Sequence, residues 1–299
     1  MRAAALFLAL VLAGPAAATP ACGEFDAALD QRLARDPSSL EVNTLLFEAA
    51  GAGCAEALPR LFVAGASRLA RDREGDTALG IAARAGRTAV VETLLSEEKR
   101  QLDLADARGA TPLMLAIHSG RGAIARRLLE AGAAVDAADR QGETALSEAA
   151  FAADEEIGLA LLEKGARADT RDRTGNRPLC YAAARGALKL TAALIDAGGG
   201  ADARCGGETT ALMWAAGHPD LTRTELAVAT TKLLLSRGAD MDTTDDRGRS
   251  ALMIAAALNR FETARVLLDA GADRKLRDKG GATAADLATT PEMRALVGP

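Results

Sequence analysis

The sequence predicts an all-α solenoid in which short helical units stack along one axis, and two observations support this fold class. A block of the form Asp-x-x-Gly-x-Thr-(Pro/Ala)-Leu recurs at a nearly constant interval from residue 72 onwards. Apolar residues make up 49% of the chain but aromatic residues only 3%, so Ala, Leu and Val must form the core. A fixed period of this kind means that each unit buries its apolar face on its neighbours.

The recurring block sets the expected domain boundaries. It begins at Asp72, Asp106, Asp139, Asp172, Cys205, Asp245 and Asp278, at intervals of 34, 33, 33, 33, 40 and 33 residues. We therefore expect six repeats, numbered one to six below, at 72–105, 106–138, 139–171, 172–204, 205–244 and 245–277. Terminal repeats need a polar outer face. Residues 19–71, which contain a degenerate repeat, are expected to form the N-terminal cap, and residues 278–299 a C-terminal capping half-repeat.

Each unit carries the start and stop signals of two helices. The Thr or Ser of the block can cap the first helix through its hydroxyl, and Pro112 and Pro178 stand at the first helical position, where a missing N–H costs nothing. In the second repeat, residues 113–117 form a short apolar helix before Gly120 opens a turn. The second helix is expected to end at Gly132, because glycine adopts the left-handed conformation that satisfies the last carbonyls.

With these motifs, the chain resembles ankyrin-repeat proteins, over about residues 44 to 297. The family's Thr-Pro-Leu position is occupied at residues 77–79, 111–113, 144–146, 177–179, 210–212, 250–252 and 283–285. The resemblance implies stacked helix-turn-helix units with β-turn tips that project at right angles to the helices. The His that follows Thr-Pro-Leu in the family is absent, replaced by Gly80, Met114, Ser147, Cys180, Met213 and Met253.

Residues 1–18 have the layout of a secretory signal peptide. Arg2 supplies the positive charge, residues 3–14 are apolar but too short for a stable membrane span, and residues 16–18 offer a small-residue cleavage site. We expect cleavage after Ala18. No other stretch is apolar and long enough to span a membrane, so we expect an exported, periplasmic chain without a membrane span.

Four cysteines remain after that cleavage, and an even count in an oxidising compartment favours two disulfides with three possible connectivities. The resemblance narrows the choice. Cys180 begins one first helix and Cys205 opens the next tip, positions that are neighbours in an ankyrin stack, so we expect them to pair. Cys22 would then pair with Cys54 and hold the mature N-terminus on the cap.

The sequence shows no enzyme chemistry, metal site or cofactor motif. His118 and His218 are the two histidines, and neither has a carboxylate or second His three or four residues away. The net charge of −5 and the scarcity of aromatic residues argue against a nucleic-acid partner. We expect a non-enzymatic protein without a cofactor.

Two sets of residues are candidates for binding a protein partner. The first is a series of turn-tip cations, which would form a basic stripe or act only as solvated turn charge. These tip arginines are Arg73, Arg108, Arg140, Arg173 and Arg247. The second set follows the Ala-Ala pair of the first helices, which faces the concave groove in ankyrin proteins. These groove residues are Arg84, His118, Phe151, Arg185, His218 and Leu258. Phe151 either anchors a partner or fills space in a repeat that lacks glycine there.

The fifth repeat is seven residues longer than its neighbours, and the extra length lies in residues 217–225. Insertions in solenoids fall in loops and often serve recognition, although a neutral insertion is also tolerated.

The resulting hypothesis is a protein–protein interaction module that acts outside the cytoplasm as an adaptor, an inhibitor or immunity factor, or an assembly factor. The resemblance adds stress defence, because secreted bacterial ankyrin proteins have been linked to it and to neutralising toxic effectors. The alternative is a carrier of haem or another small ligand in the concave groove, for which Met114, His118, Met213 and His218 are the only candidate ligands. The sequence identifies neither the partner nor the oligomeric state.

Overall fold

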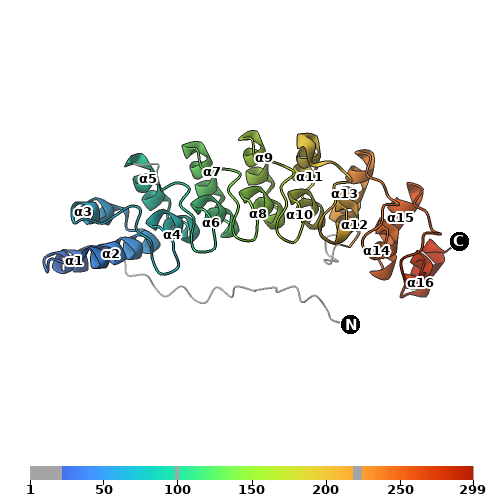
Figure 1. Ribbon diagram of the computed structural model, residues 1–299, viewed down its shortest axis with the longest axis horizontal. Helices are drawn as coiled ribbons and strands as arrows, with labels where there is room; N and C mark the ends of the chain where they lie inside the picture. Colours follow the sequence, from blue (N-terminus) through green and yellow to red (C-terminus); the bar gives the residue numbers. More distant parts are fainter. Residues whose placement is uncertain (1–21, 98–100, 218–223, 299) are drawn as a thin grey trace.

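The computed structural model describes residues 22–97, 101–217 and 224–298, and shows an elongated, arched solenoid (Figure 1). The described residues form helices and turns without a strand; Ala138 and Thr144 form an isolated β-bridge in one tip. The predicted all-α solenoid is therefore confirmed. The predicted signal peptide, residues 1–18, lies outside the described residues.

The predicted repeats each contain two helices. The first helices are α4 (Ala78–Ala85), α6 (Pro112–His118), α8 (Ala145–Ala152), α10 (Pro178–Arg185), α12 (Ala211–Ala216) and α14 (Ala251–Ala257). The second helices are α5 (Thr88–Glu97), α7 (Gly122–Ala131), α9 (Glu155–Glu163), α11 (Leu188–Leu194), α13 (Thr224–Ser236) and α15 (Phe261–Asp269). First helices contact first helices and second helices contact second helices of the adjacent repeats. Two layers result, with the first helices on the concave side of the arch (Figure 1).

The ends of the solenoid are built differently from the repeats. The N-terminal segment contains α1 (Cys22–Leu33), α2 (Ser39–Ala52), the 3-10 turn η1 (Ala55–Ala57) and α3 (Leu58–Val63). The C-terminal segment contains α16 (Ala284–Leu287) and α17 (Pro291–Val297). The C-terminal segment, which we expected to form a capping half-repeat, contains a shortened helix pair, in which Thr290 caps the second helix at Pro291.

Two short elements fall between the repeat helices. The π-helical turn η2 (Ile195–Gly199) follows α11, and the 3-10 turn η3 (Gly206–Glu208) forms the tip of the fifth repeat. The predicted insertion lies between α12 and α13, mostly outside the described residues.

The helix starts and stops agree with the sequence signals. Thr111 accepts a hydrogen bond from the Met114 N–H, and Thr77, Thr144, Thr210, Ser250 and Thr283 cap their helices in the same way. Pro112 and Pro178 stand in the first turn of α6 and α10. Gly132 ends α7 with φ of 95°, a conformation that side chains with a Cβ avoid. The predicted Thr and Ser caps of the first helices and the glycine at the end of α7 are therefore confirmed.

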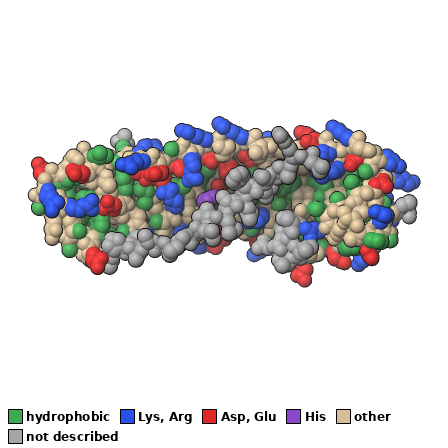
Figure 2. All heavy atoms as spheres, turned by 90° about the horizontal axis from the view of Figure 1, so that it is seen from below, with side chains coloured by type: hydrophobic (Ala, Val, Ile, Leu, Met, Phe, Trp, Pro, Cys, Tyr) green, Lys and Arg blue, Asp and Glu red, His purple; other side chains and the backbone are tan. Residues whose placement is uncertain are grey.

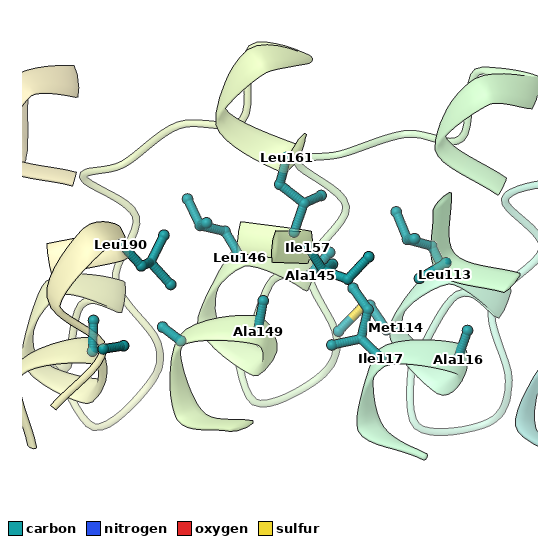
Figure 3. Close-up of a cluster of buried hydrophobic side chains, with 14 of the residues drawn as sticks. Leu113, Met114, Ala116, Ile117, Ala145, Leu146, Ala149, Ile157, Leu161 and Leu190 are labelled. Carbon is teal, nitrogen blue, oxygen red and sulfur yellow. The ribbon is translucent and has the colours of Figure 1, made fainter. Parts of the chain in front are cut away.

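The core runs continuously through the stack. Leu113, Met114 and Ile117 of α6 pack towards Leu146 of α8, and Leu161 of α9 lies above them (Figure 3). Alanines on the facing sides let the helices approach closely, so Leu113, Leu146 and Leu161 are fully enclosed. A fully buried Leu contributes about 1.5–3 kcal/mol relative to exposure, which is why apolar stacking holds the chain together.

The turn tips are held by the aspartate that begins each block. The Asp106 Oδ1 accepts hydrogen bonds from the N–H groups of Arg108 and Ala110, at 2.8 and 2.9 Å. The aspartates at 72, 139, 172, 245 and 278 do the same in their own tips. Cys205 replaces this aspartate in the fifth repeat, and the structure joins its sulfur to Cys180 of α10.

Candidate protein-interaction surface

The tip arginines lie along one edge of the solenoid and are exposed. Backbone hydrogen bonds join successive tips: the Arg140 N–H donates to the Arg108 carbonyl at 2.8 Å, and the Arg173 N–H to the Gln141 carbonyl at 2.7 Å. Within the described residues, the side chains of Arg73, Arg140, Arg173 and Arg247 form no ion pair, whereas Arg108 pairs with Asp106 at 3.1 Å. Four guanidinium groups are thus available to a partner.

A second group of arginines, immediately before the block, has a structural task. Arg204 Nη1 donates to the carbonyls of Glu208 and Thr244, both at 2.7 Å, and so ties its own tip to the next repeat. Arg71 and Arg277 donate to the carbonyls of Gly75 and Gly281 in the same manner. The cations near the tips therefore divide into a set that holds the turns and a set that faces solvent. Basic and acidic side chains are interspersed on the face shown in Figure 2.

Two of the groove residues are held by acidic neighbours. Arg84 Nη2 lies 2.6 Å from Oδ2 of Asp76, whose side chain is only 1% exposed. Burial raises the pKa of Asp76 and the Arg84 charge lowers it, so Arg84 compensates a buried carboxylate. His118, at the end of α6, lies with Nδ1 3.3 Å from Oε2 of Glu148 in the next repeat. Sequence spacing could not show this partner, because it comes from a different helix.

Phe151 begins a row of aromatic side chains along the first helices. Its ring is 55% exposed and packs edge-on against Tyr181, with ring centroids 5.8 Å apart. Tyr181 packs edge-on against Trp214 at the same distance. The Arg185 guanidinium carbon lies 5.0 Å from the Phe151 centroid, and Arg185 Nε donates to the Phe151 carbonyl at 2.8 Å. We call Phe151, Tyr181 and Trp214 the aromatic row.

Hydrogen bonds hold the other two members of this row, Tyr181 and Trp214, in place. The Tyr181 hydroxyl donates to Oδ2 of Asp172 at 2.6 Å, and burial together with this bond raises the pKa of Tyr181 well above its usual value. The Trp214 indole N–H donates to the Thr209 hydroxyl at 2.8 Å. The row is therefore a rigid surface, and exposed rigid aromatic groups are common anchors of protein interfaces.

Carboxylates lie beside the aromatic row. Glu143 ends the tip of the third repeat and Glu148 lies on α8, with a side chain 16% exposed. Burial raises the pKa of Glu143 to about 7, and the negative charges of Glu148, Asp139 and Asp172 act in the same direction. Each described carboxylate in this group thus opposes ionisation of Glu143.

Two adjoining depressions connect these features. One, of about 440 Å³, lies between the tips and first helices of the second and third repeats and includes Met114, Arg140 and Gln141 in its wall. The other, of about 210 Å³, extends towards Phe151 and Tyr181. His118, Glu143 and Glu148 line both depressions. The structure thus brings Arg108, Arg140, His118 and Phe151, which the sequence singled out, into one area.

The remaining predicted binding residues lie elsewhere. Arg73, Arg173 and Arg247 are on other tips, and Leu258 is 46% exposed at the end of α14. His218 lies outside the described residues. Counted from the first residue of its helix, each of Arg84, His118 and Phe151 is seventh, whereas Arg185 and Leu258 are eighth. The predicted groove positions are therefore not all equivalent, yet the Arg185 side chain still reaches the Phe151 ring.

Sequence reasoning missed Tyr181, Trp214, Glu143 and Glu148. Three of them share the fourth position of a first helix, which is otherwise occupied by Ile81, Leu115 and Ile254. This change from aliphatic to polar or aromatic residues at one repeat position was the available signal.

The carrier hypothesis receives no support from the described residues. Met114 and Met213 are each 2% exposed and belong to the core, although Met114 contributes to the wall of the larger depression. No group of three or more His, Cys, Asp or Glu in the described part of the chain could hold a metal ion. None of the helices described is both long and apolar enough to cross a membrane.

Comparisons with known proteins identify the family. The family model for ankyrin repeats in three copies matches residues 98–172 and 225–294. No curated protein matches the chain. The crystal structure of the ankyrin repeat domain of Bcl-3, described as a unique member of the IkappaB protein family, is similar, with a TM-score of 0.61 and 26% sequence identity over 76% of this chain and 100% of that one.

Stacked helix pairs with linked, projecting turns place the molecule in the class of helical repeat solenoids. The repeat motifs, the family match and the structural similarity together show that the chain contains ankyrin repeats. Such repeats are protein–protein interaction modules.

Proposed function

We propose that this protein binds another protein through its concave face, in a surface centred on Phe151. The observation that carries the proposal is the exposed Phe151 ring, held between Tyr181 and the Arg185 guanidinium on a rigid stack of helices. Large aromatic and arginine side chains carry most of the energy of typical interfaces. The tip arginines without ion pairs lie beside this surface and would speed association with an acidic partner.

We further propose that binding takes place outside the cytoplasm, where the chain would serve as an adaptor, inhibitor or assembly factor. The layout of residues 1–18 supports export, and the two cysteine pairs suit an oxidising compartment. N-terminal sequencing of chain recovered from the periplasmic fraction tests the first step, with Thr19 as the expected first residue. An intact Met1 on chain recovered from the cytoplasm would contradict it.

The binding surface can be tested with the mature chain and a partner identified by cross-linking in periplasmic extract. Phe151→Ala and Arg185→Ala should each weaken binding by more than about 1 kcal/mol, because both remove parts of the proposed anchor. Glu163→Ala, at the exposed end of α9, is the matched control and should bind as tightly as the natural chain. Association should also slow as salt rises, since exposed arginines act over a Debye length of about 8 Å at physiological salt.

The opposite pattern of variant effects would show that the partner binds elsewhere on the molecule. If both groove variants bound normally while deletion of residues 219–224 abolished binding, recognition would belong to the insertion of the fifth repeat. The tip arginines would then be solvated turn charge.

A further inference from the structure

Of the two glutamates beside the aromatic row, Glu148 faces His118 at 3.3 Å, whereas Glu143 has no cation partner among the described residues. Asp139 and Asp172 use their Oδ1 atoms for tip N–H groups, and Asp172 Oδ2 accepts from Tyr181. Of the basic groups that line the depressions, Arg108 pairs with Asp106 and His118 contacts Glu148, while Arg140 lies on the tip side. The Glu143 end of the cluster therefore keeps unrelieved repulsion between like charges.

An aromatic wall lies next to these carboxylates. The smaller depression is lined by the carboxylates of Glu143 and Glu148 and by the Phe151 and Tyr181 rings, together with His118 and Ser147. Carboxylates bind guanidinium groups through paired, charge-assisted hydrogen bonds, and aromatic rings attract cations through the ring quadrupole. The Phe151 ring already holds the Arg185 guanidinium, at 5.0 Å from its centroid. The guanidinium group of a binding partner would meet both carboxylates and aromatic rings in the depression.

The size of the depression limits what can enter it. Its volume of about 210 Å³ falls below the roughly 300–1,000 Å³ of typical small-molecule sites. It suits a single long side chain. The pocket lies open on the concave face, so that side chain could belong to a protein segment lying across the first helices.

From charge complementarity, aromatic lining and size, we propose that the depression between Glu143, Glu148, Phe151 and Tyr181 is a specificity pocket for an arginine side chain of the protein partner. This inference rests on the proposed protein-binding function and names the chemistry that the partner must present. The arginine head group pairs with the two carboxylates, and its flat face lies against the rings.

The single tyrosine of the chain provides a direct readout. Because Tyr181 is the only tyrosine in 299 residues, ring ¹³C-tyrosine labelling gives signals from this residue alone. The mature, disulfide-bonded chain is titrated with N-acetyl-arginine methylamide at constant ionic strength. N-acetyl-citrulline methylamide has nearly the same shape without the charge and is the matched ligand control. The arginine probe should shift the Tyr181 signals in a saturable way, with at least tenfold higher affinity than the citrulline probe.

Variants of the carboxylates complete the test. Glu143→Gln and Glu148→Gln should each weaken binding of the arginine probe at least tenfold, while Glu163→Gln on α9 should leave it unchanged. Circular dichroism checks that each variant is folded. Equal shifts from the two probes, no shift from either, or equal affinity in the natural chain and the Gln variants would overturn the proposal.

The outcome can be separated from that of the proposed function. If partner binding is weakened by Phe151→Ala but not by Glu143→Gln or Glu148→Gln, and the arginine probe does not bind, the arginine pocket is wrong and the protein-binding face remains. If the probe binds as expected but no groove variant affects partner binding, the proposed function of this face fails.

Discussion

The structure opposes ionisation of Glu143. Its carboxyl lies partly buried at the junction of the third tip and α8. The carboxylates of Asp139, Glu148 and Asp172 of the next tip raise its pKa, while His118 and Arg140 line the same depression without an ion pair to it. The pKa of about 7 lies above the ordinary value of 4.5. The folded chain therefore binds more protons than the unfolded chain between these two pH values, and this group makes stability fall as pH rises through that window.

Glu143→Gln should accordingly stabilise the chain at alkaline pH. We expect a gain in the free energy of unfolding of about 1 kcal/mol at pH 8, after allowance for solvent screening of a half-buried carboxyl, and little difference at pH 4.5. Urea denaturation of the natural chain and the variant across this range measures the effect. Glu163→Gln, at an exposed position on α9, should follow the natural chain at every pH. A stability difference that does not change with pH would contradict the prediction.

At the scale of single helices, α8 departs from its neighbours at its C-terminal end. Helices α4 and α10 end at Gly86 and Gly186 with φ of 78° and 71°, whereas α8 ends at Ala153 with φ of 57°. The left-handed conformation costs an L-residue with a Cβ about 1–2 kcal/mol. The strained end lies two residues after Phe151, so the helix that presents the proposed anchor carries the less favourable cap.

Ala153→Gly should relieve this strain. We expect the free energy of unfolding to rise by about 0.5–1 kcal/mol, because the gain in the folded state exceeds the extra backbone entropy of glycine in the unfolded state. Ala152→Gly is the matched control: it lies one residue earlier, inside α8, and should destabilise the chain by about 1 kcal/mol. Thermal or urea denaturation of the two variants should give opposite signs, and destabilisation by both would contradict the assignment of Ala153 as a strained cap.

At the scale of the whole molecule, each repeat contacts mainly its neighbours, so stability is a sum of local interfaces. The two cysteine pairs lie where the chain departs from the regular repeat. Cys22 of α1 lies with its Cα 5.3 Å from that of Cys54, at the N-terminal end of the stack. Cys180 and Cys205, with Cα atoms 6.7 Å apart, join the fourth repeat to a tip that lacks the usual aspartate.

The structure pairs the same cysteines as the sequence analysis, and solution chemistry can decide the pairing. Non-reducing peptide mapping should find Cys22 joined to Cys54 and Cys180 joined to Cys205. Replacement of both Cys180 and Cys205 by Ser should lower the free energy of unfolding by about 3 kcal/mol, because the unfolded chain then regains the freedom of the open loop. Four free thiols in exported chain, or a link between Cys22 and Cys205, would contradict the assignment.

The sequence by itself determined the features that depend on neighbouring residues. The block from Asp106 to Leu113 specifies a tip, a Thr cap and a helix start within eight positions, and the structure realises each of them. The repeat period then specifies the stacking, because every unit exposes the same apolar stripe. The exposure of Phe151 could also be expected, since it follows the buried Ala-Ala pair of its helix.

Only the tertiary structure decided what meets across the repeats. Glu148 reaches His118, and Tyr181 lies between Phe151 and Trp214, although these partners are about 30 residues apart in sequence. Stacking places equivalent positions of successive repeats side by side, so the side chains that meet on the concave face come from several repeats. The raised pKa of Glu143 is such a case: Asp139 and Glu148 are its neighbours in sequence, but its burial and the approach of Asp172 from the next tip come only from the fold.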